Sequence, residues 1–438
     1  MYCELHNHLY GSLTAERLYT IGKRNPNPRW NIFTDSYEKA YGRIIEPSKF
    51  FEEYDTLEKF SKLYYFNHRG PFPEFQAKFN LIIALVPFTI DEMKNLTEQI
   101  VLDHARENVS HTEYRIMFPP NEERDIFERR IQAICCGLEE GEALALKEGL
   151  NIRSEAILSI HRNQNTIENY NWLKELMAKD SLVNDRLTGI DFCHIEEGFP
   201  PKEKEGFFNR VLSDNKIDPN SALAIVYHVA ESYEDKTPFS ASRWVWESVK
   251  YGAHRLGHCI ALGVDPKYFA NSIRKESTKE RVDQLNWELT HYEEITRFGE
   301  YYSRQEIEKN LKECHHSPLS NQNVKIHIDE ISIRYLRTLQ DYILNFVKES
   351  NSVIESCPSS NFYIGMIHNA KEHPLKRFVE NKVKVTIGSD DPGIFDTNLQ
   401  KEYTMAKEIG LSEQEIETIR TKSFLYTSAL LSGRTKSS

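Results

Sequence analysis

Short apolar segments with the length of β-strands recur along the chain and alternate with longer amphipathic segments. This alternation constrains the fold most, because repeated strand–helix units build a parallel sheet covered by helices. The predicted strands are Tyr2 to Leu9, His111 to Phe118, Ala156 to His161, Thr188 to Ile195, Leu223 to Ala230, Arg255 to Leu262, Val353 to Cys357 and Val383 to Ile387. Eight units predict an α/β protein with a (β/α)8, or TIM, barrel, a fold that accommodates 438 residues in one domain.

Two segments are longer than ordinary connections in such a repeat. The first joins the first and second strands and is rich in Tyr and Phe from Tyr37 to Phe79. The second is an insertion between the sixth and seventh strands, at approximately residues 264–333. The predicted elements in and after it are a helix at 281–295, a polar loop at 310–326 and a helix at 331–348. We therefore expect a single domain over residues 1–438 that carries a long helical insertion.

Charge and composition exclude some classes of protein. The formal net charge is −11, from 55 Lys and Arg against 66 Asp and Glu, so no extended nucleic-acid surface is expected. No apolar stretch is long enough to span a bilayer, and the start of the chain lacks a signal-peptide pattern. The seven cysteines form no C-x-x-C pair, which indicates reduced thiols. These features predict a cytoplasmic protein without membrane contact.

Residue types that bind metals follow several of the predicted strands. His6 and His8 stand two residues apart in the first strand, so both imidazoles point to one face and can chelate one divalent metal. His228 ends the fifth strand, and Glu231 follows it, which suits a metal ligand beside a proton-transfer group. Taken alone, His228 also fits a hydrogen-bonded histidine of the core, and Glu231 a solvated carboxylate.

Two further motifs follow the sixth and eighth strands. The sixth strand contains R-L-G-H, which ends at His258, and the eighth is followed by G-S-D-D-P, which contains Asp390 and Asp391. Paired aspartates there can place one carboxylate on a metal and the other on a substrate N–H, although the same residues also suit a plain turn. In a parallel barrel the active site lies at the C-terminal ends of the strands, where all four motifs fall. Their joint occurrence predicts a metal-dependent active site.

The motifs H-x-H, H-x-x-E, R-L-G-H and S-D-D-P, together with E-S-C-P-S-S-N at residues 355–361, resemble the adenosine deaminase family of metal-dependent amidohydrolases. The resemblance runs from His6 to about Phe395, interrupted by the two long segments. It implies a (β/α)8 barrel with one Zn²⁺ per subunit. It also implies hydrolytic deamination of adenosine, or of a related purine nucleoside or nucleotide, to an inosine-type product and ammonia.

The resemblance assigns roles residue by residue. The implied zinc ligands are His6, His8, His228 and Asp390. His258 corresponds to the residue that orients and deprotonates the attacking water, Glu231 to the acid that protonates N1 of the purine, and Asp391 to the partner of N7. For its role, Glu231 must hold its proton in the resting site, which requires a pKa raised by burial or by a nearby carboxylate.

Three positions depart from the pattern of the family. Tyr10 stands where the family usually carries an Asp that holds the ribose 5′-hydroxyl. His194 stands where a small residue, commonly Gly, is found, and Cys259 replaces a Gly after His258. We interpret Tyr10 and His194 as substrate-binding residues that alter the ribose end of the pocket. A 5′-modified nucleoside, a nucleotide or a free base is therefore an alternative to adenosine.

Two other functions stay open. The chain could be an amidohydrolase that acts on a different ring or amide, although an obvious lysine to bridge two metals is missing from the fourth strand. It could also be a non-catalytic barrel whose insertion binds a partner or a second copy of the chain. The presence of Glu231, His258 and Asp391 beside four ligand candidates disfavours this reading, because a metal-only scaffold needs none of the three. Arg115 and Arg162, near the expected pocket, fit structural ion pairs better than phosphate anchors.

Overall fold

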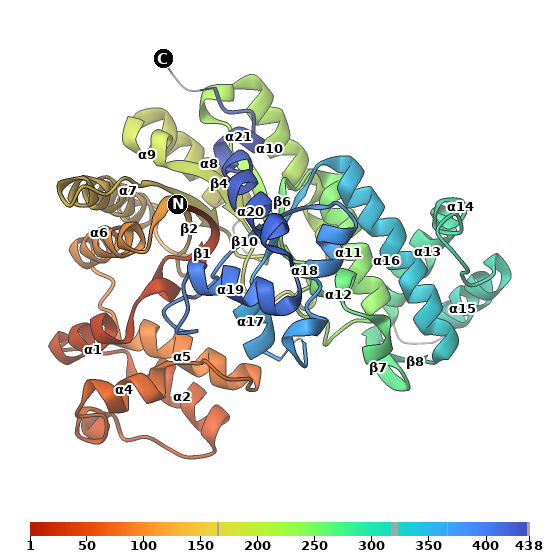
Figure 1. Cartoon of the computed structure of the whole chain (residues 1–438), viewed down its shortest axis with the longest axis horizontal. Coiled ribbons are helices and arrows are strands. Elements are labelled where there is room, and N and C mark those ends of the chain that lie inside the picture. The colour runs from red at the N-terminus through yellow and green to blue at the C-terminus, as the bar shows by residue number, and fades with distance from the viewer. Residues whose placement is uncertain (164–165, 317–322, 366, 436–438) are drawn as a thin grey trace.

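The computed structural model describes residues 1–163, 166–316, 323–365 and 367–435, and its main sheet contains eight parallel strands (Figure 1). In sheet order these are β1 (Tyr2–His8), β2 (Val109–Met117), β3 (Arg153–Ser159), β4 (Leu187–Asp191), β5 (Ala224–Val229), β6 (Arg255–His258), β9 (Val353–Ser356) and β10 (Lys384–Ile387). A parallel bridge between Asn7 and Asp390 joins the last strand to the first. The sheet therefore forms a nearly closed barrel, and the predicted (β/α)8 fold is confirmed.

Each predicted strand is present, but two end four residues earlier than expected. β4 ends at Asp191 rather than Ile195, and β6 ends at His258 rather than Leu262. After His258 the chain turns at Cys259, whose backbone φ of 52° is left-handed, and the short helix α12 (Ile260–Gly263) begins. The predicted end of the sixth strand was wrong because a short apolar run fits a buried strand and a buried helix equally well.

Helices cover the outside of the barrel (Figure 1). Those that follow the strands are α7 (Arg124–Lys147), α8 (Thr166–Lys179), α9 (Ser181–Arg186), α10 (Glu205–Ile217), α11 (Pro238–Tyr251), α16 (Glu330–Ser350), α17 (Pro358–Tyr363), α18 (Leu375–Glu380), α19 (Leu399–Ile409) and α20 (Glu413–Lys422). The predicted helix at 331–348 is present as α16, which begins after Asp329, whose side chain caps two backbone N–H groups. Among the described residues, no helix is both long and apolar enough to cross a membrane.

The segment between β1 and β2 folds into a helical layer at one side of the barrel mouth (Figure 1). Its helices are α1 (Ala15–Arg24), α2 (Trp30–Tyr41), α3 (Phe50–Glu53), α4 (Leu57–Tyr64), α5 (Phe72–Leu85) and α6 (Ile90–Arg106). The Tyr and Phe residues noted in the sequence pack together here, and Phe33, Phe50 and Phe60 are fully or almost fully buried. From α5, Phe75 stacks on Phe395, with ring centroids 5.3 Å apart. The aromatic segment therefore packs against the loop that follows β10.

The insertion contains strands as well as helices. Its elements are β7 (Ser272–Ser277), α13 (Thr278–Thr290), α14 (Tyr292–Ile295), α15 (Arg304–His316) and β8 (Asn323–Ile328), and β7 pairs with β8 in antiparallel register. The predicted helix at 281–295 is present as α13 and α14. The predicted loop at 310–326 was wrong at both ends, which lie in α15 and β8; residues 317–322 lie outside the described residues. Polar and apolar residues alternate in the β8 sequence N-V-K-I-H-I, but the run of 6 residues is too short to decide between strand and loop.

Buried polar contacts close the end of the barrel opposite the site. The C-terminal segment packs there through α21 (Ser428–Leu431), and the backbone N–H and Oγ of Ser428 each donate a 2.6 Å hydrogen bond to the Glu113 carboxylate. Arg255 also donates to Glu113, at 2.6 Å, and to the carbonyl of Tyr426, at 2.8 Å. Glu113 and Arg255 are fully buried. Their charges are therefore satisfied by each other and by the C-terminal segment.

Replacement of Ser428 by Ala removes one hydrogen bond from the buried Glu113 carboxylate. We expect Ser428→Ala to lower the free energy of unfolding by about 1–3 kcal/mol, the usual cost of a buried polar group that loses a partner. Urea denaturation measures this difference. Ser432→Ala is the matched control, because the Ser432 hydroxyl donates to the carbonyl of Ala429 in the same segment rather than to Glu113. Equal stability of the two variants would contradict the expectation.

Candidate active site

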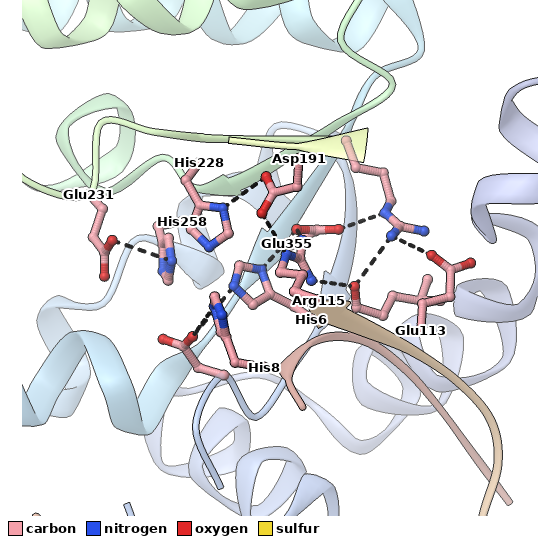
Figure 2. A network of polar contacts seen from close by, with 12 residues as sticks. His6, His8, Glu113, Arg115, Asp191, His228, Glu231, His258 and Glu355 are labelled. Atoms are coloured by element: carbon pink, nitrogen blue, oxygen red, sulfur yellow. Dashed lines mark hydrogen bonds and ion pairs between the residues drawn. The ribbon is translucent and has the colours of Figure 1, made fainter. Parts of the chain in front are cut away.

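Five side chains predicted from the sequence converge at the carboxyl ends of the strands (Figure 2). His6 and His8 come from β1, His228 from β5 and His258 from β6, and Asp390 follows β10. Oδ1 of Asp390 lies 3.6 Å from Nε2 of His6 and 3.3 Å from Nε2 of His8. The ring centroids of His6 and His228 are 4.7 Å apart, and those of His6 and His258 are 4.8 Å apart. The structure thus groups residues from four strands around one point.

The donor atoms of this cluster fit a divalent metal. The Nε2 atoms of His6 and His228 are buried and have no hydrogen-bond partner, an arrangement that costs free energy unless a ligand satisfies them. Possible ligand atoms of His6, His8 and His228 lie within 4.8 Å of one another, as do those of His6, His258 and Asp390. Imidazoles with a carboxylate suit Zn²⁺ and other borderline divalent ions.

Two of these imidazoles contact a carboxylate through Nδ1, the nitrogen that points away from the cluster. Nδ1 of His6 lies 2.8 Å from Glu355, and Nδ1 of His228 lies 3.0 Å from Asp191 (Figure 2). Because a carboxylate accepts the hydrogen of Nδ1, the neutral ring presents a lone pair at Nε2, the nitrogen that points into the cluster. Glu355 and Asp191 therefore orient both rings with Nε2 toward the cluster, as metal binding would require.

A buried ion-pair network holds the two carboxylates in turn. Arg255 Nε donates to Glu355 at 2.6 Å, and Arg115 contacts both Glu355 and Asp191, the latter at 3.3 Å. Burial alone would raise the pKa of Asp191, but His228 and Arg115 bring it below its usual range. The pKa of Glu355 is likewise lowered by Arg115 and Arg255 against the effect of burial. Both carboxylates are therefore ionised.

Of the two arginines noted in the sequence, only Arg115 forms the expected ion pairs. The guanidinium of Arg162 instead donates to the backbone carbonyls of Phe192 and His228, both at 2.7 Å, and lies over the ring of Tyr227. Among the described residues, no carboxylate pairs with Arg162 in the structure. Its hydrogen bonds join the ends of β4 and β5 beside the site, so its role in the fold is to hold two strands together.

A chain of hydrogen bonds sets the orientation of His258. The backbone N–H of Leu375 donates to Nδ1 of His373, so the neutral His373 ring carries its hydrogen on Nε2, which faces Oδ1 of Asn361 at 3.2 Å. The amide nitrogen of Asn361 then donates to Nδ1 of His258 at 3.0 Å. In its neutral form His258 therefore carries its hydrogen on Nε2, the nitrogen 3.5 Å from Glu231.

Two acidic side chains with raised pKa values lie beside the cluster. Glu231 follows β5 and is 27% exposed; burial, Asp390 and Glu196 raise its pKa well above the usual value. Burial raises the pKa of Asp391 to about 7. The Oδ1 atom of Asp391 is buried without a hydrogen-bond partner and lies against Gly11, where a Cβ would be only 1.7 Å away. The raised pKa of Glu231 agrees in direction with the requirement derived from the sequence, that this carboxyl keeps its proton more readily than an ordinary glutamate.

Left-handed backbone conformations mark the ends of four barrel strands. At the ends of β4, β5, β6 and β10, non-glycine residues with positive φ include His194 at 72°, Ala230 at 55°, His258 at 66°, Cys259 at 52° and Asp390 at 61°. Each costs of order 1–3 kcal/mol unless the surrounding structure holds it, and such residues gather at functional sites. This geometry also explains why a glycine suits the positions of His194 and Cys259 in the family pattern.

The two substrate-binding candidates lie away from the metal cluster. Tyr10 is in a 3₁₀ turn after β1, and its ring meets Phe88 edge to face, with centroids 4.8 Å apart. Its hydroxyl is buried and has no hydrogen-bond partner. His194 follows β4 and is exposed, and its ring centroid lies 6.1 Å from that of His161. Both residues follow strands that carry site residues, so they border the site without joining the cluster.

Several residues that hold the ligand side chains were not predicted from the sequence. Glu355 and Asn361 belong to the E-S-C-P-S-S-N motif, and Ser360 of the same motif donates a 2.6 Å hydrogen bond to Asp390. Asp191 carried a weaker signal, since an acidic residue inside an apolar strand needs a partner when it is buried. The motif thus contained the supporting residues, but only the fold shows what each one contacts.

A (β/α)8 barrel with histidines and carboxylates gathered at its strand ends is typical of metal-dependent hydrolases. The sequence model described as adenosine deaminase matches residues 2–436, and the chain belongs to this family.

Relatives and solved structures agree with that membership. The adenine deaminase of Wolinella succinogenes is 23% identical over 426 residues, which cover 96% of this chain and 90% of that protein. The adenine deaminase of Rhizobium leguminosarum is 38% identical over 86 residues, but this match spans only 19% of the chain and 27% of the relative. This second match is local, and it covers about a quarter of the length of the relative.

Two solved structures show the same fold. The structure of Arabidopsis ADAL complexed with IMP has a TM-score of 0.58 at 18% identity, and the match covers 98% of this chain and 92% of that one. A Burkholderia ambifaria amidohydrolase with bound Zn has a TM-score of 0.56 at 14% identity, and the match covers 97% of this chain and 85% of that one.

Removal of the Asp191 carboxylate, which lies 3.0 Å from Nδ1 of His228, tests whether this contact strengthens metal binding. We expect Asp191→Ala to weaken Zn²⁺ binding by about 10- to 100-fold, because the Nδ1 hydrogen of His228 loses its acceptor. Competition with a chelator of known affinity measures the dissociation constant. Asp185→Ala, which removes a partly exposed carboxylate paired with Arg153, is the control. An unchanged dissociation constant in Asp191→Ala would contradict the expected support.

Proposed function

We propose that the chain is a zinc-dependent hydrolase that removes the exocyclic amine of adenosine or a related purine and releases ammonia. The single observation that carries the proposal is the position of Glu231, a carboxyl with a raised pKa, 3.5 Å from His258 and beside the metal-ligand cluster. A protonated acid next to a metal site is the arrangement that protonation of a ring nitrogen requires.

His6, His8, His228 and Asp390 are the residues that would hold the metal. The unpartnered Nε2 atoms of His6 and His228 support this assignment, and the outward Nδ1 contacts fix the orientation of both rings. A bound divalent ion supplies Lewis acidity, which makes water a stronger nucleophile near neutral pH. Membership of a metal-dependent family and a neighbouring fold with bound Zn support zinc in particular.

The other site residues act on the purine and on the attacking water. Glu231 donates its proton to N1, which makes the carbon that bears the amine more electrophilic. The pKa of Asp391, raised by burial to about 7, leaves this carboxyl partly protonated at neutral pH, so it can donate a hydrogen bond to N7. His258 orients the attacking water, and the hydrogen-bond chain through Asn361 supports this part of its predicted role.

We propose a class of purine substrates rather than a single compound. The relatives compared above are called adenine deaminases, and a solved structure with the same fold contains IMP. Tyr10 replaces the usual Asp at the ribose end, and its hydroxyl lies beside Phe88 rather than in the cluster. We therefore include the free base, the nucleoside and the 5′-nucleotide among the substrates, with Tyr10 and His194 at the end that distinguishes them.

A variant of Glu231 separates catalysis from metal binding. We expect Glu231→Gln to reduce the kcat of ammonia release by at least about 100-fold, the contribution of general acid catalysis, because the amide cannot protonate N1. Zinc content should be unchanged, because Glu231 is not among the proposed ligands. Coupled-enzyme detection of ammonia and metal analysis of the same sample measure both effects.

The control is Glu234→Gln, an exposed residue of the same loop, which should keep full activity. Full activity in Glu231→Gln would refute the assignment of the proton donor. A variant that loses its zinc would instead place Glu231 among the ligands.

A further inference from the structure

The loop that carries Glu231 is held by two separate parts of the chain. It spans residues 230–237, between β5 and α11, and its first turn bonds to the neighbouring β4 loop. The carboxylate of Glu196 accepts the backbone N–H groups of Ala230, at 3.0 Å, and of Glu231, at 3.2 Å. Glu196 is buried, and these two bonds fix the backbone where the acid side chain begins. The β4 loop also reaches the later part of the loop, where the backbone N–H of Gly198 donates to Asp235 at 2.8 Å, and the insertion supplies further contacts.

Arg274 of β7 contacts the middle of this loop. Its guanidinium donates to the backbone carbonyl of Tyr233 and, at 3.3 Å, to that of Lys236. The same guanidinium lies over the ring of Tyr233, with Cζ 5.5 Å from the ring centroid. The same ring also meets Phe269 of the insertion edge to face, with centroids 5.6 Å apart. Two residues of the insertion therefore contact Tyr233, two positions after Glu231.

Glu276, two residues further along β7, contacts the far end of the loop. Its Oε2 accepts hydrogen bonds from the backbone N–H of Thr237 at 3.0 Å, from the Thr237 hydroxyl at 3.0 Å and from the Ser240 hydroxyl at 2.8 Å. Its side chain is fully buried. A buried carboxylate with three donors from one helix start holds that start firmly, since loss of any donor costs free energy.

The insertion can act as a fixed support because it is anchored to the barrel. On α11, Arg243 forms ion pairs with Glu247 and with Glu280 of α13, and the indole N–H of Trp244 donates to Glu280 at 2.9 Å. Arg243 also donates to Gln284 of α13 at 3.0 Å. The first helix of the insertion is thus joined to α11 by buried polar contacts, and β7 reaches the loop from this anchored base.

We infer that the base of the insertion positions Glu231, with Arg274 and Glu276 as positioning residues for the proton donor. Among the described residues, the carboxyl of Glu231 forms one ion-pair contact, with His258 at 3.5 Å, so its own contacts fix it weakly. Its place is set by the backbone of the loop. Glu196 holds this backbone at the start, and from Tyr233 onward the insertion holds it at Tyr233, Lys236 and Thr237, together with the β4 loop at Asp235. This inference rests on the proposed function for its catalytic consequence, but the support of the loop is independent of it.

Arg274→Ala, compared with Lys275→Ala, tests the inference. Lys275 is the exposed neighbour on the same strand, so its variant controls for a change of charge on β7. In Arg274→Ala we expect faster amide hydrogen exchange over residues 230–237 and a kcat for ammonia release lower by about 10- to 100-fold, because a small misplacement of a catalytic group is costly. KM should change less than kcat, and zinc content should stay the same.

Conservative variants keep the test decisive if Arg274→Ala folds poorly. Arg274→Lys retains one donor to the loop and should show an intermediate rise in exchange and an intermediate loss of kcat. Glu276→Gln, which removes the charge but not the shape, should raise exchange mainly at Thr237 and in the first turn of α11. Rescue by Arg274→Lys relative to Arg274→Ala would support positioning.

Other outcomes overturn the inference. Exchange and kcat equal to those of Lys275→Ala would show that the insertion does not hold the loop. Loss of zinc in Arg274→Ala would show that β7 supports the metal ligands rather than the proton donor. If the unmodified protein releases no ammonia from any purine, the proposed function fails, and hydrogen exchange alone then decides whether the insertion holds the loop.

Discussion

The site depends on charges buried inside the barrel. Glu355 lies between Arg115 and Arg255, and all three side chains are fully buried. Burial of a single charge in a protein interior costs several kcal/mol, so each of these groups is stable only with its partners in place. The network orients two imidazole rings. Glu355 holds His6 and Asp191 holds His228, the two histidines with unpartnered Nε2 atoms. Apolar packing could not choose which nitrogen of each ring faces the cluster.

The same network connects the two ends of the barrel. Arg255 bonds to Glu355 on the side of the site and to Glu113 on the opposite side, where the C-terminal segment supplies Ser428. The end of the chain is therefore linked to a metal-ligand candidate through consecutive buried contacts. On the outer side of the site, the insertion holds the loop of Glu231. The metal-ligand candidates and Glu231 thus have separate supports, one inside the barrel and one outside it.

The sequence predicted the fold well because the strand–helix alternation and the strand-end motifs agree with each other. His6, His8, His228, His258 and Asp390 converge as expected, since parallel strands place their carboxyl ends at one mouth. What could not be predicted depends on contacts between segments far apart in the chain. Asn361 reaches His258 across 103 residues, and nothing near either residue indicates this bond.

Local ambiguity accounts for the other errors. The apolar run after His258 continues as helix, and the segment taken for a polar loop contains β8, because short runs carry too little periodicity to decide. Substrate contact by Tyr10 stays a prediction. The structure adds that the Tyr10 ring packs on Phe88, a residue outside every motif.

The central claim is that this family member deaminates a purine, and ammonia release measures it directly. The zinc-loaded protein would be assayed with adenosine, 2′-deoxyadenosine, adenine, AMP, ATP and 5′-substituted adenosines at equal concentration. The account predicts ammonia from at least one of them and none from the metal-free protein. Absence of ammonia from every purine, with zinc bound and the protein folded, would contradict it and favour an amidohydrolase of another ring or amide.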